Sequence, residues 1–364
     1  TRVWVTGAVD SIGGVNGEVR YGFDARGHLL ADTAYRNATA LVTTYTRDQY
    51  DRDSVVTDPV GAWRPRYETT RGIPERLVTP LGDSVSLTLD GQQRPSQRTV
   101  LSSGPAFTQS VQYLASSGAA KITQTAGASG YEVGTYDPEG APDEPTLGAP
   151  LGPIWVEQHG PSPLLPDTLV DSLSYDGWGR LLGWQHFRKA DALLTLLASD
   201  SVWFDRTGNV HVNGETRTHE LQTDRLLTRV AGAWTWSYTY DAGGNLTQAS
   251  GTKQSQTITW TYQYDAANQL RSVRYRGHGW GADSLVARYG YDVLGRRIAR
   301  RVYWSPLPGA EPRETRYLYQ GGQVVAETDA AGAFKWKYTW GPGTDNLVGL
   351  QDSTGTQFYV VQDQ

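Results

Sequence analysis

The chain has 364 residues, a formal net charge of −5 at pH 7 and no cysteine. The lack of cysteine excludes disulfide scaffolds, thiolate metal sites and cysteine nucleophiles, and the acidic balance argues against nucleic-acid binding. Tyr (21), Trp (13) and Gly (41) are abundant, which is typical of short strands joined by tight turns, and no apolar run reaches the ~18 residues of a membrane-spanning helix.

The chain begins with the strand pattern Thr-Arg-Val-Trp-Val, without methionine and without a visible signal peptide. We interpret this start as that of a piece of a longer protein. A hairpin unit is predicted at 21–29, YGFDARGHL, with weaker copies at 87–95, LTLDGQQRP, and 134–142, GTYDPEGAP. Residues 1–140 are therefore interpreted as a region of degenerate repeats.

The middle of the chain is poorer in such units. Residues 130–155 are rich in Pro, Gly and acidic side chains, which predicts an exposed loop or linker, placed at 141–170. The segment ADALLTLLASD at 190–200 is the one passable candidate for a short helix, although its apolar run also suits a buried strand. We expect the rest of the chain to be mostly strand.

Well-formed units fill residues 171–364. Their sequences are LSYDGWGRL at 173–181, VWFDRTGNV at 202–210, YTYDAGGNL at 238–246, YQYDAANQL at 262–270 and YGYDVLGRRI at 289–298, with a weaker copy, YLYQGGQVV, at 317–325. The aspartates of the strong units, at 176, 205, 241, 265 and 292, are separated by 29, 36, 24 and 27 residues. The chain is therefore an internal repeat with insertions between its units.

Each position of a unit has a structural reason. In YTYDAGGNL the two tyrosines lie two residues apart and share one face of a strand. Asp241 accepts a hydrogen bond from a turn amide, and Gly244 supplies the positive φ that the turn requires. This geometry pairs Asp241 with Asn245, and Tyr240 with Leu246, across the hairpin.

The same register places opposite charges face to face, Asp176 against Arg180 and Asp292 against Arg296. Where Asn268 replaces the glycine, the unit keeps the next best residue for a left-handed conformation. A structural repeat role, and no catalytic, cofactor-binding or metal-binding role, is assigned to Asp24, Gly27, Tyr175, Asp176, Gly179, Asp205, Gly208, Tyr240, Asp241, Gly244, Tyr264, Asp265, Asn268, Tyr291, Asp292 and Gly295.

These tandem units resemble a known repeat family. Together with the closing segments RYLYQGGQVVAETDAAGAFKWKYTWGPG and FYVVQD, they are similar to the C-terminal part of the Rhs/YD-repeat core found in bacterial polymorphic toxins, C subunits of insecticidal toxin complexes and teneurins. The similarity is strong from 171 to 363 and weaker from 21 to 140.

The resemblance implies a β-ribbon that spirals into a hollow shell. In toxin members the shell encloses a C-terminal effector polypeptide, so the implied partners are the rest of a parent Rhs protein and its effector. The implied location is secreted or at the bacterial cell surface. A β-propeller is the alternative all-β fold, but spacings of 24 to 36 residues fit equal four-stranded blades poorly.

Toxin members also cut themselves after a D-P-x-G-L segment downstream of the core. The present chain has DPVGA at 58–62 and DPEGA at 137–141, both upstream and both without the leucine. We interpret them as turns, because proline at the second turn position pre-sets φ. The protease segment and the effector are expected to be absent, and no enzymatic activity is predicted.

A metal site is the remaining chemical possibility. His211, Glu215 and His219 would share a face on one continuous strand, but Asn213-Gly214 predicts a hairpin that separates the two histidines. We therefore expect no metal and no cofactor. The other histidines, His28, His159, His186 and His278, are isolated in the sequence.

The aromatic rows provide an alternative function. A carbohydrate-binding adhesive module could stack cell-surface glycans on Trp234, Trp236, Trp260, Tyr262, Trp336 and Trp340, although cross-strand packing is the default for such rows. The sequons at Asn37 and Asn245 carry little weight, because Asn245 lies in a hairpin. The final FYVVQDQ reads as the first arm of a further unit, so the parent chain is expected to continue past Gln364.

Overall fold

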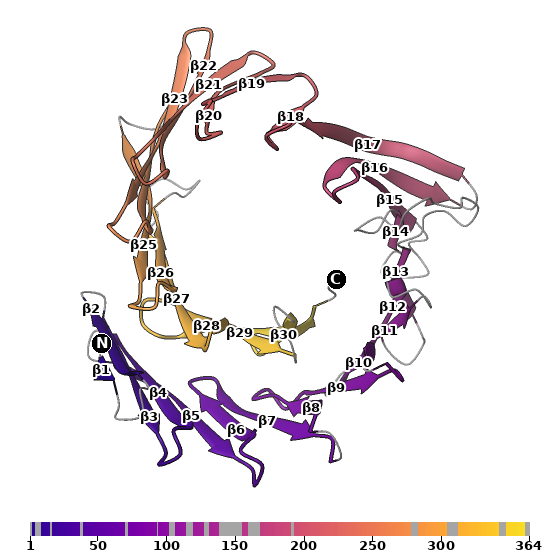
Figure 1. Cartoon of the computed structure of the whole chain (residues 1–364), viewed down its shortest axis with the longest axis vertical. Coiled ribbons are helices and arrows are strands. Elements are labelled where there is room, and N and C mark those ends of the chain that lie inside the picture. Colours follow the sequence, from indigo (N-terminus) through magenta and orange to yellow (C-terminus); the bar gives the residue numbers. More distant parts are fainter. Residues whose placement is uncertain are drawn as a thin grey trace. The chain divides into compact units, whose positions relative to one another are not determined.

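The computed structural model shows strands that follow one another in chain order (Figure 1). It describes residues 2–3, 9–14, 17–36, 39–69, 72–92, 94–101, 106–113, 119–126, 131–137, 155–158, 168–190, 193–277, 283–303, 312–341 and 347–360. Within these ranges every regular element is a strand, β1 to β31, and no helix occurs. No helix long and apolar enough to cross a membrane was found in this part of the chain.

The chain divides into two units. The first comprises Thr1–Gly82, Thr218–Glu220 and Arg225–Gln364. Its strands are β1 (Arg2–Val3), β2 (Val9–Gly14), β3 (Gly17–Phe23), β4 (Leu29–Arg36), β5 (Thr39–Arg47), β6 (Asp53–Asp58), β7 (Gly61–Tyr67), β8 (Pro74–Val78), β20 (Leu226–Ala231), β21 (Trp234–Tyr240), β22 (Leu246–Lys253), β23 (Gln256–Tyr264), β24 (Leu270–Arg276), β25 (Ser284–Tyr291), β26 (Arg297–Val302), β27 (Arg313–Gln320), β28 (Gln323–Thr328), β29 (Phe334–Trp340), β30 (Leu347–Asp352) and β31 (Gln357–Tyr359).

The second unit comprises Asp83–Arg217 and Leu221–Asp224. Its strands are β9 (Ser84–Leu89), β10 (Pro95–Leu101), β11 (Phe107–Tyr113), β12 (Ala119–Ala126), β13 (Tyr131–Asp137), β14 (Trp155–Gln158), β15 (Thr168–Tyr175), β16 (Leu181–Ala190), β17 (Leu193–Phe204) and β18 (Val210–Val212). The division falls within β19 (Glu215–His219).

Strand pairing follows the sequence. From β19 to β31 the strands form one 13-stranded sheet in chain order, and neighbouring strands from β20 to β31 pair antiparallel. The described strands of the second unit pair in the same way. The all-β class and the hairpin-repeat architecture are therefore confirmed, because the propeller alternative would divide such a run into separate four-stranded blades.

Alternation along the strands matches the repeat chemistry. In β21, the aromatic residues Trp234, Trp236, Tyr238 and Tyr240 are half-buried, whereas the Thr and Ser residues between them are exposed. Successive side chains of a strand point to opposite faces, so the Tyr-x-Tyr pattern supplies one packed face and one solvent face.

The core of the first unit lies between two layers of strands. Trp63 of β7 is buried together with Leu318, Val325 and Ala326 of β27 and β28. Val325 and Ala326 are adjacent in β28 and both are 0% exposed. Because adjacent residues point to opposite faces, β28 is covered on both faces.

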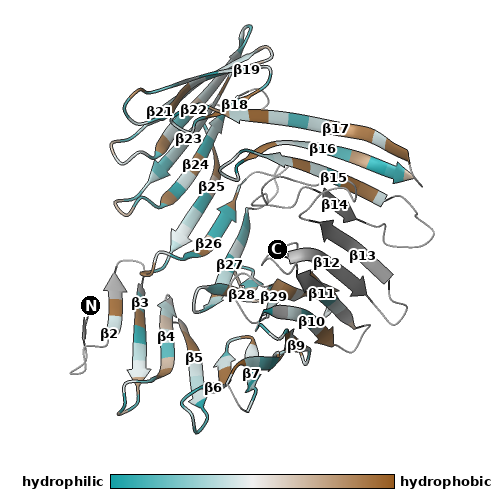
Figure 2. Ribbon diagram, turned by 45° about the vertical axis from the view of Figure 1, so that its right-hand side comes forward, coloured by the Kyte–Doolittle hydropathy of each residue, from teal (hydrophilic) through white to brown (hydrophobic). Residues whose placement is uncertain are grey.

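Of the two alternatives for 190–200, the strand is correct and the helix is wrong. Leu193–Phe204 forms β17, and its residues from 193 to 201 pair with β16. This pairing overrides the helix propensity of Leu and Ala. The strand is not buried either: Leu193 is 68% exposed, and hydrophobic bands run along β17 in Figure 2.

Little of the predicted linker at 141–170 lies within the described residues. Residues 155–158 form β14, and residues 168–170 begin β15, which pairs with β14. The rest of that range, and the predicted DPEGA turn beyond Asp137, fall outside the described residues.

Candidate functional site: the row of aspartate turns

The repeat aspartates form turns of one geometry. In each turn, the aspartate N–H donates to the carbonyl four residues on, and the N–H three residues on donates back to the aspartate carbonyl. The third residue after the aspartate has positive φ, as expected, with 88° at Gly244, 81° at Gly295 and 60° at Asn268. The predicted pairing of Tyr240 with Leu246 is also present.

The carboxylate completes the turn. Asp176 Oδ1 accepts the N–H groups of Trp178 and Arg180, each at 2.9 Å, and its Oδ2 accepts Arg180 Nε at 2.7 Å. These bonds, led by the Arg180 amide, hold the pKa of Asp176 below its usual value. Asp292 and Arg296 repeat the arrangement, with Nε to Oδ2 at 2.7 Å, so both predicted charge pairs are present.

Three turns with this geometry were missed in the sequence. Their aspartates are Asp48, Asp329 and Asp352, each of which accepts the amides two and four residues on. D-x-x-G at 329–332 and 352–355 was the available signal. No Tyr-x-Tyr precedes either of these two motifs. In the Asp48 turn, Asp51 occupies the position of the glycine and has φ 61°.

Neighbouring turns are bonded to one another. Asn245 Nδ2 donates to Asp241 at 2.9 Å within its own turn, and also to Asn268 Oδ1 of the next turn at 2.9 Å. Arg296 Nη1 similarly donates to the carbonyl of Gly321. The side chain four residues after the aspartate therefore links the hairpins laterally, which the sequence motif did not indicate.

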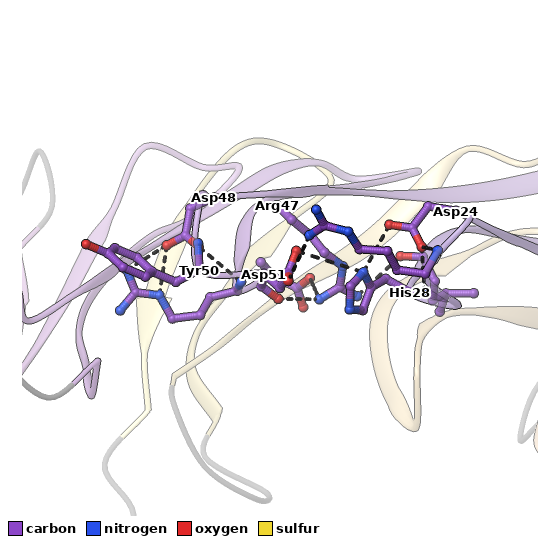
Figure 3. Close-up of polar contacts among 10 residues, drawn as sticks. Asp24, His28, Arg47, Asp48, Tyr50 and Asp51 are labelled. Carbon is purple, nitrogen blue, oxygen red and sulfur yellow. Dashed lines mark hydrogen bonds and ion pairs between the residues drawn. The ribbon is translucent and has the colours of Figure 1, made fainter.

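Figure 3 shows this link between the turns of Asp24 and Asp48. His28 occupies the position that Arg takes in other units, with Nδ1 3.0 Å from Asp24 Oδ2 and 3.9 Å from Asp51 Oδ1. His186 also has a carboxylate partner, since its Nδ1 lies 2.6 Å from Asp171 Oδ1. Both histidines, isolated in the sequence, thus contact aspartates in the structure.

The remaining histidines form no metal group in the described part of the chain. A two-residue turn with Gly214 at φ 75° joins β18 to β19, as predicted. His211 stacks on Trp203 at 3.8 Å between ring centroids, and Glu215 pairs with Arg217 at 2.7 Å. No cluster of three His, Cys, Asp or Glu residues suited to a metal occurs among the described residues. His159 and His278 lie outside them.

The DPVGA segment is a turn, as predicted. Asp58 ends β6 and accepts the N–H groups of Val60 at 2.7 Å and Gly61 at 3.0 Å. Its other oxygen accepts Trp63 Nε1 at 2.7 Å. Burial raises the pKa of Asp58, and these three bonds all lie within the β6–β7 hairpin.

The aromatic rows largely pack on one another. Ring centroids lie 5.9 Å apart for Trp234 and Trp236, and 4.6 Å apart for Trp260 and Tyr275. Burial raises the pKa of Tyr262. The first contact runs along β21 and the second crosses from β23 to β24, so these rings pack within the sheet.

No family model and no curated protein matches the chain. Similar solved structures include the crystal structures of TcdB2-TccC3-Cdc42 (12% identity, 92% of this chain, 22% of that chain, TM-score 0.46) and TcdB2-TccC3-TEV (13%, 97%, 24%, 0.41). A third is the Tc holotoxin pore of Photorhabdus luminescens (12%, 95%, 23%, 0.32). The chain spans less than a quarter of the length of each, and with TM-scores below 0.5 these likenesses assign no family.

Proposed function

We propose that the chain is a non-enzymatic part of an Rhs/YD-repeat shell that encloses or presents a partner polypeptide in a secreted or cell-surface bacterial protein. The observation that carries the proposal is a single turn design, repeated along a sheet whose strand order follows the sequence from β19 to β31. A sheet built this way lengthens by adding hairpins, and each hairpin contacts mainly its neighbours.

The absence of enzymatic activity is proposed from the state of the carboxylates. Acid–base or nucleophilic catalysis needs a carboxylate that can reach a substrate. In the turns of Asp176, Asp205 and Asp352, both turn amides are bonded to the aspartate. A broad panel of glycans and peptides should remain intact on incubation with the chain, and turnover abolished by a single Asp→Asn change would contradict this part of the proposal.

Enclosure can be tested by protease protection in the parent protein. The polypeptide encoded beside the repeat region is expected to resist proteinase K in the native parent, and to be digested when expressed alone. Gly244→Val combined with Gly295→Val should shorten the protection, because both residues have positive φ.

Gln92→Ala is the matched control, since Gln92 is exposed at the tip of the Asp90 turn and only its backbone N–H bonds to Asp90. It should leave the protection unchanged. Equal digestion of the neighbouring polypeptide with and without the repeat region would refute the enclosure.

A further inference from the structure

A cavity of about 360 Å³ lies within the first unit, between the β5–β8 face and the ends of β27, β28 and β29. Its volume is at the lower end of the ~300–1,000 Å³ range of small-molecule sites. None of the turn aspartates lines it, and the repeat pattern assigns it no ligand.

Strand register builds one wall of the cavity. Tyr45 pairs with Val56, and Val56 pairs with Trp63, so the three side chains lie in a row across β5, β6 and β7. Tyr67 of β7 lines the same cavity. The wall is therefore largely aromatic and apolar.

The aromatic rings of the cavity are held by their polar atoms. Tyr67 Oη donates to the carbonyl of Asp53 at 3.0 Å, and Trp340 Nε1 donates to the carbonyl of Val324 at 2.7 Å. Tyr45 and Trp63 similarly donate to Asp32 and Asp58, at 2.8 Å and 2.7 Å. With these groups bonded to protein, the half-buried rings of Tyr45, Tyr67 and Trp340 present fixed apolar surface rather than further donors, whereas Trp63 itself is buried.

The polar part of the cavity comes from the one strong departure from the repeat turn. In YLYQGGQVV, Gln320 stands where other units have the aspartate, and a Gly321–Gly322 turn joins β27 to β28. Gly321 has φ 56°. Because this two-residue turn needs no carboxylate, Gln320 and Gln323 flank it with side-chain amides that have no hydrogen-bonding partner among the described residues, and both residues line the cavity.

The charges around the cavity balance. Asp53 is the one carboxylate in the lining, and Arg47 Nη1 lies 3.2 Å from its Oδ1. Arg52 covers the Tyr67 ring, with its guanidinium carbon 4.5 Å from the centroid, and pairs with Asp48 at 2.6 Å. A charged ligand would therefore find no uncompensated partner of opposite sign, whereas each glutamine amide offers both a donor and an acceptor.

We propose that this cavity binds a neutral saccharide of one or two rings. Hydroxyl groups both donate and accept hydrogen bonds, which suits the amides of Gln320 and Gln323, and the flat C–H faces of a sugar ring suit the fixed aromatic wall. The degenerate repeat at 317–325 is then a binding element: losing the turn aspartate released polar groups for a ligand.

The test is saturation-transfer NMR on the whole chain with glucose, galactose, N-acetylglucosamine and maltose, each at millimolar concentration, and with choline as a cationic probe. At least one saccharide should receive saturation and choline should not. In the Gln320→Ala/Gln323→Ala variant, the dissociation constant of that saccharide should rise about tenfold or more, as loss of two hydrogen bonds predicts. Melting curves should show that this variant remains folded.

Gln92→Ala removes an exposed glutamine from the second unit and should leave saccharide binding unchanged. Saccharide binding that survives the double substitution would place the site elsewhere and overturn the proposal. Binding of choline alone, or of none of the five probes, would overturn it as well, in favour of a cationic group or a polypeptide side chain in the cavity.

Discussion

The Asp292 and Asp329 turns belong to the same sheet and have the same backbone hydrogen bonds, but their side-chain surroundings differ. Asp292 is 6% exposed and holds Arg296, which also reaches the carbonyl of Gly321 in the next hairpin. Asp329 is followed at the fourth position by Ala333, so its carboxylate bonds the amides of Ala331 and Ala333, both in exposed contacts. The carboxylate–amide bonds thus define the turn, and the fourth residue decides whether the turn also fastens its neighbour.

The largest effect is expected at the buried turn. Asp292→Ala should lower the free energy of unfolding by about 3 kcal/mol, since it leaves Arg296 and two turn amides without their acceptor in a largely buried site. Urea unfolding followed by tryptophan fluorescence would measure it. Asp292→Asn, which keeps an acceptor oxygen but removes the charge, is the control and should cost less; equal costs would show that the neutral acceptor recovers nothing and that the charge accounts for the whole effect.

The next effect tests the backbone that both turns share. Gly244→Val should destabilise by about 2 kcal/mol, because φ is 88° and a β-branched residue is strained there. Gly177→Val is the matched control: Gly177 has no left-handed φ and nothing lies within 4 Å of an added Cβ. Thermal melts of the two variants that coincide would exclude backbone strain as the reason for glycine.

A smaller effect is expected at the exposed turn. Asp329→Ala should cost about 1 kcal/mol, the usual loss for carboxylate caps of backbone amides without a side-chain partner. The difference from Asp292→Ala measures what burial and the arginine link add. A loss as large as that at Asp292 would mean that the turn amides alone account for both values.

The smallest effect concerns pH. The Thr207 hydroxyl is the first of several donors that lower the pKa of Asp205 from 3.8. A carboxylate with a lowered folded pKa stabilises the protein above its unfolded pKa, and this stabilisation is lost as the pH falls through the folded value. The Asp205→Asn variant should therefore lose less melting temperature than the wild type between neutral pH and pH values below 3.8. If the melting temperatures of the two proteins fell by the same amount over this pH range, the stabilising role of the Asp205 carboxylate would be contradicted.

Local chemistry explains how far the sequence could be interpreted. Asp241, Gly244 and Asn245 lie within five residues of one another, and their hydrogen bonds close inside one hairpin. The turn geometry, the pairing across it and the charge pairs could therefore be predicted. The Asp329 turn was missed because the preceding strand lacks Tyr-x-Tyr, although its D-x-x-G was present.

The β17 strand shows the limit of local propensity. Its Leu-rich segment has no alternation that distinguishes helix from strand, and pairing with β16 decides between them. How exposed β17 is depends on which other parts of the protein cover its sheet, and a local sequence pattern does not indicate that.

The sequence by itself determined the hairpin unit, because a carboxylate, a residue with positive φ and a return strand act over a few covalently joined residues. Only the tertiary structure decided that β28 is covered on both faces, that Asn245 bonds Asn268, and that Tyr67 shares a cavity with Gln320. These contacts join residues far apart in the chain. They depend on how whole strands align and pack, and a repeat motif read within one hairpin contains no information about its neighbours.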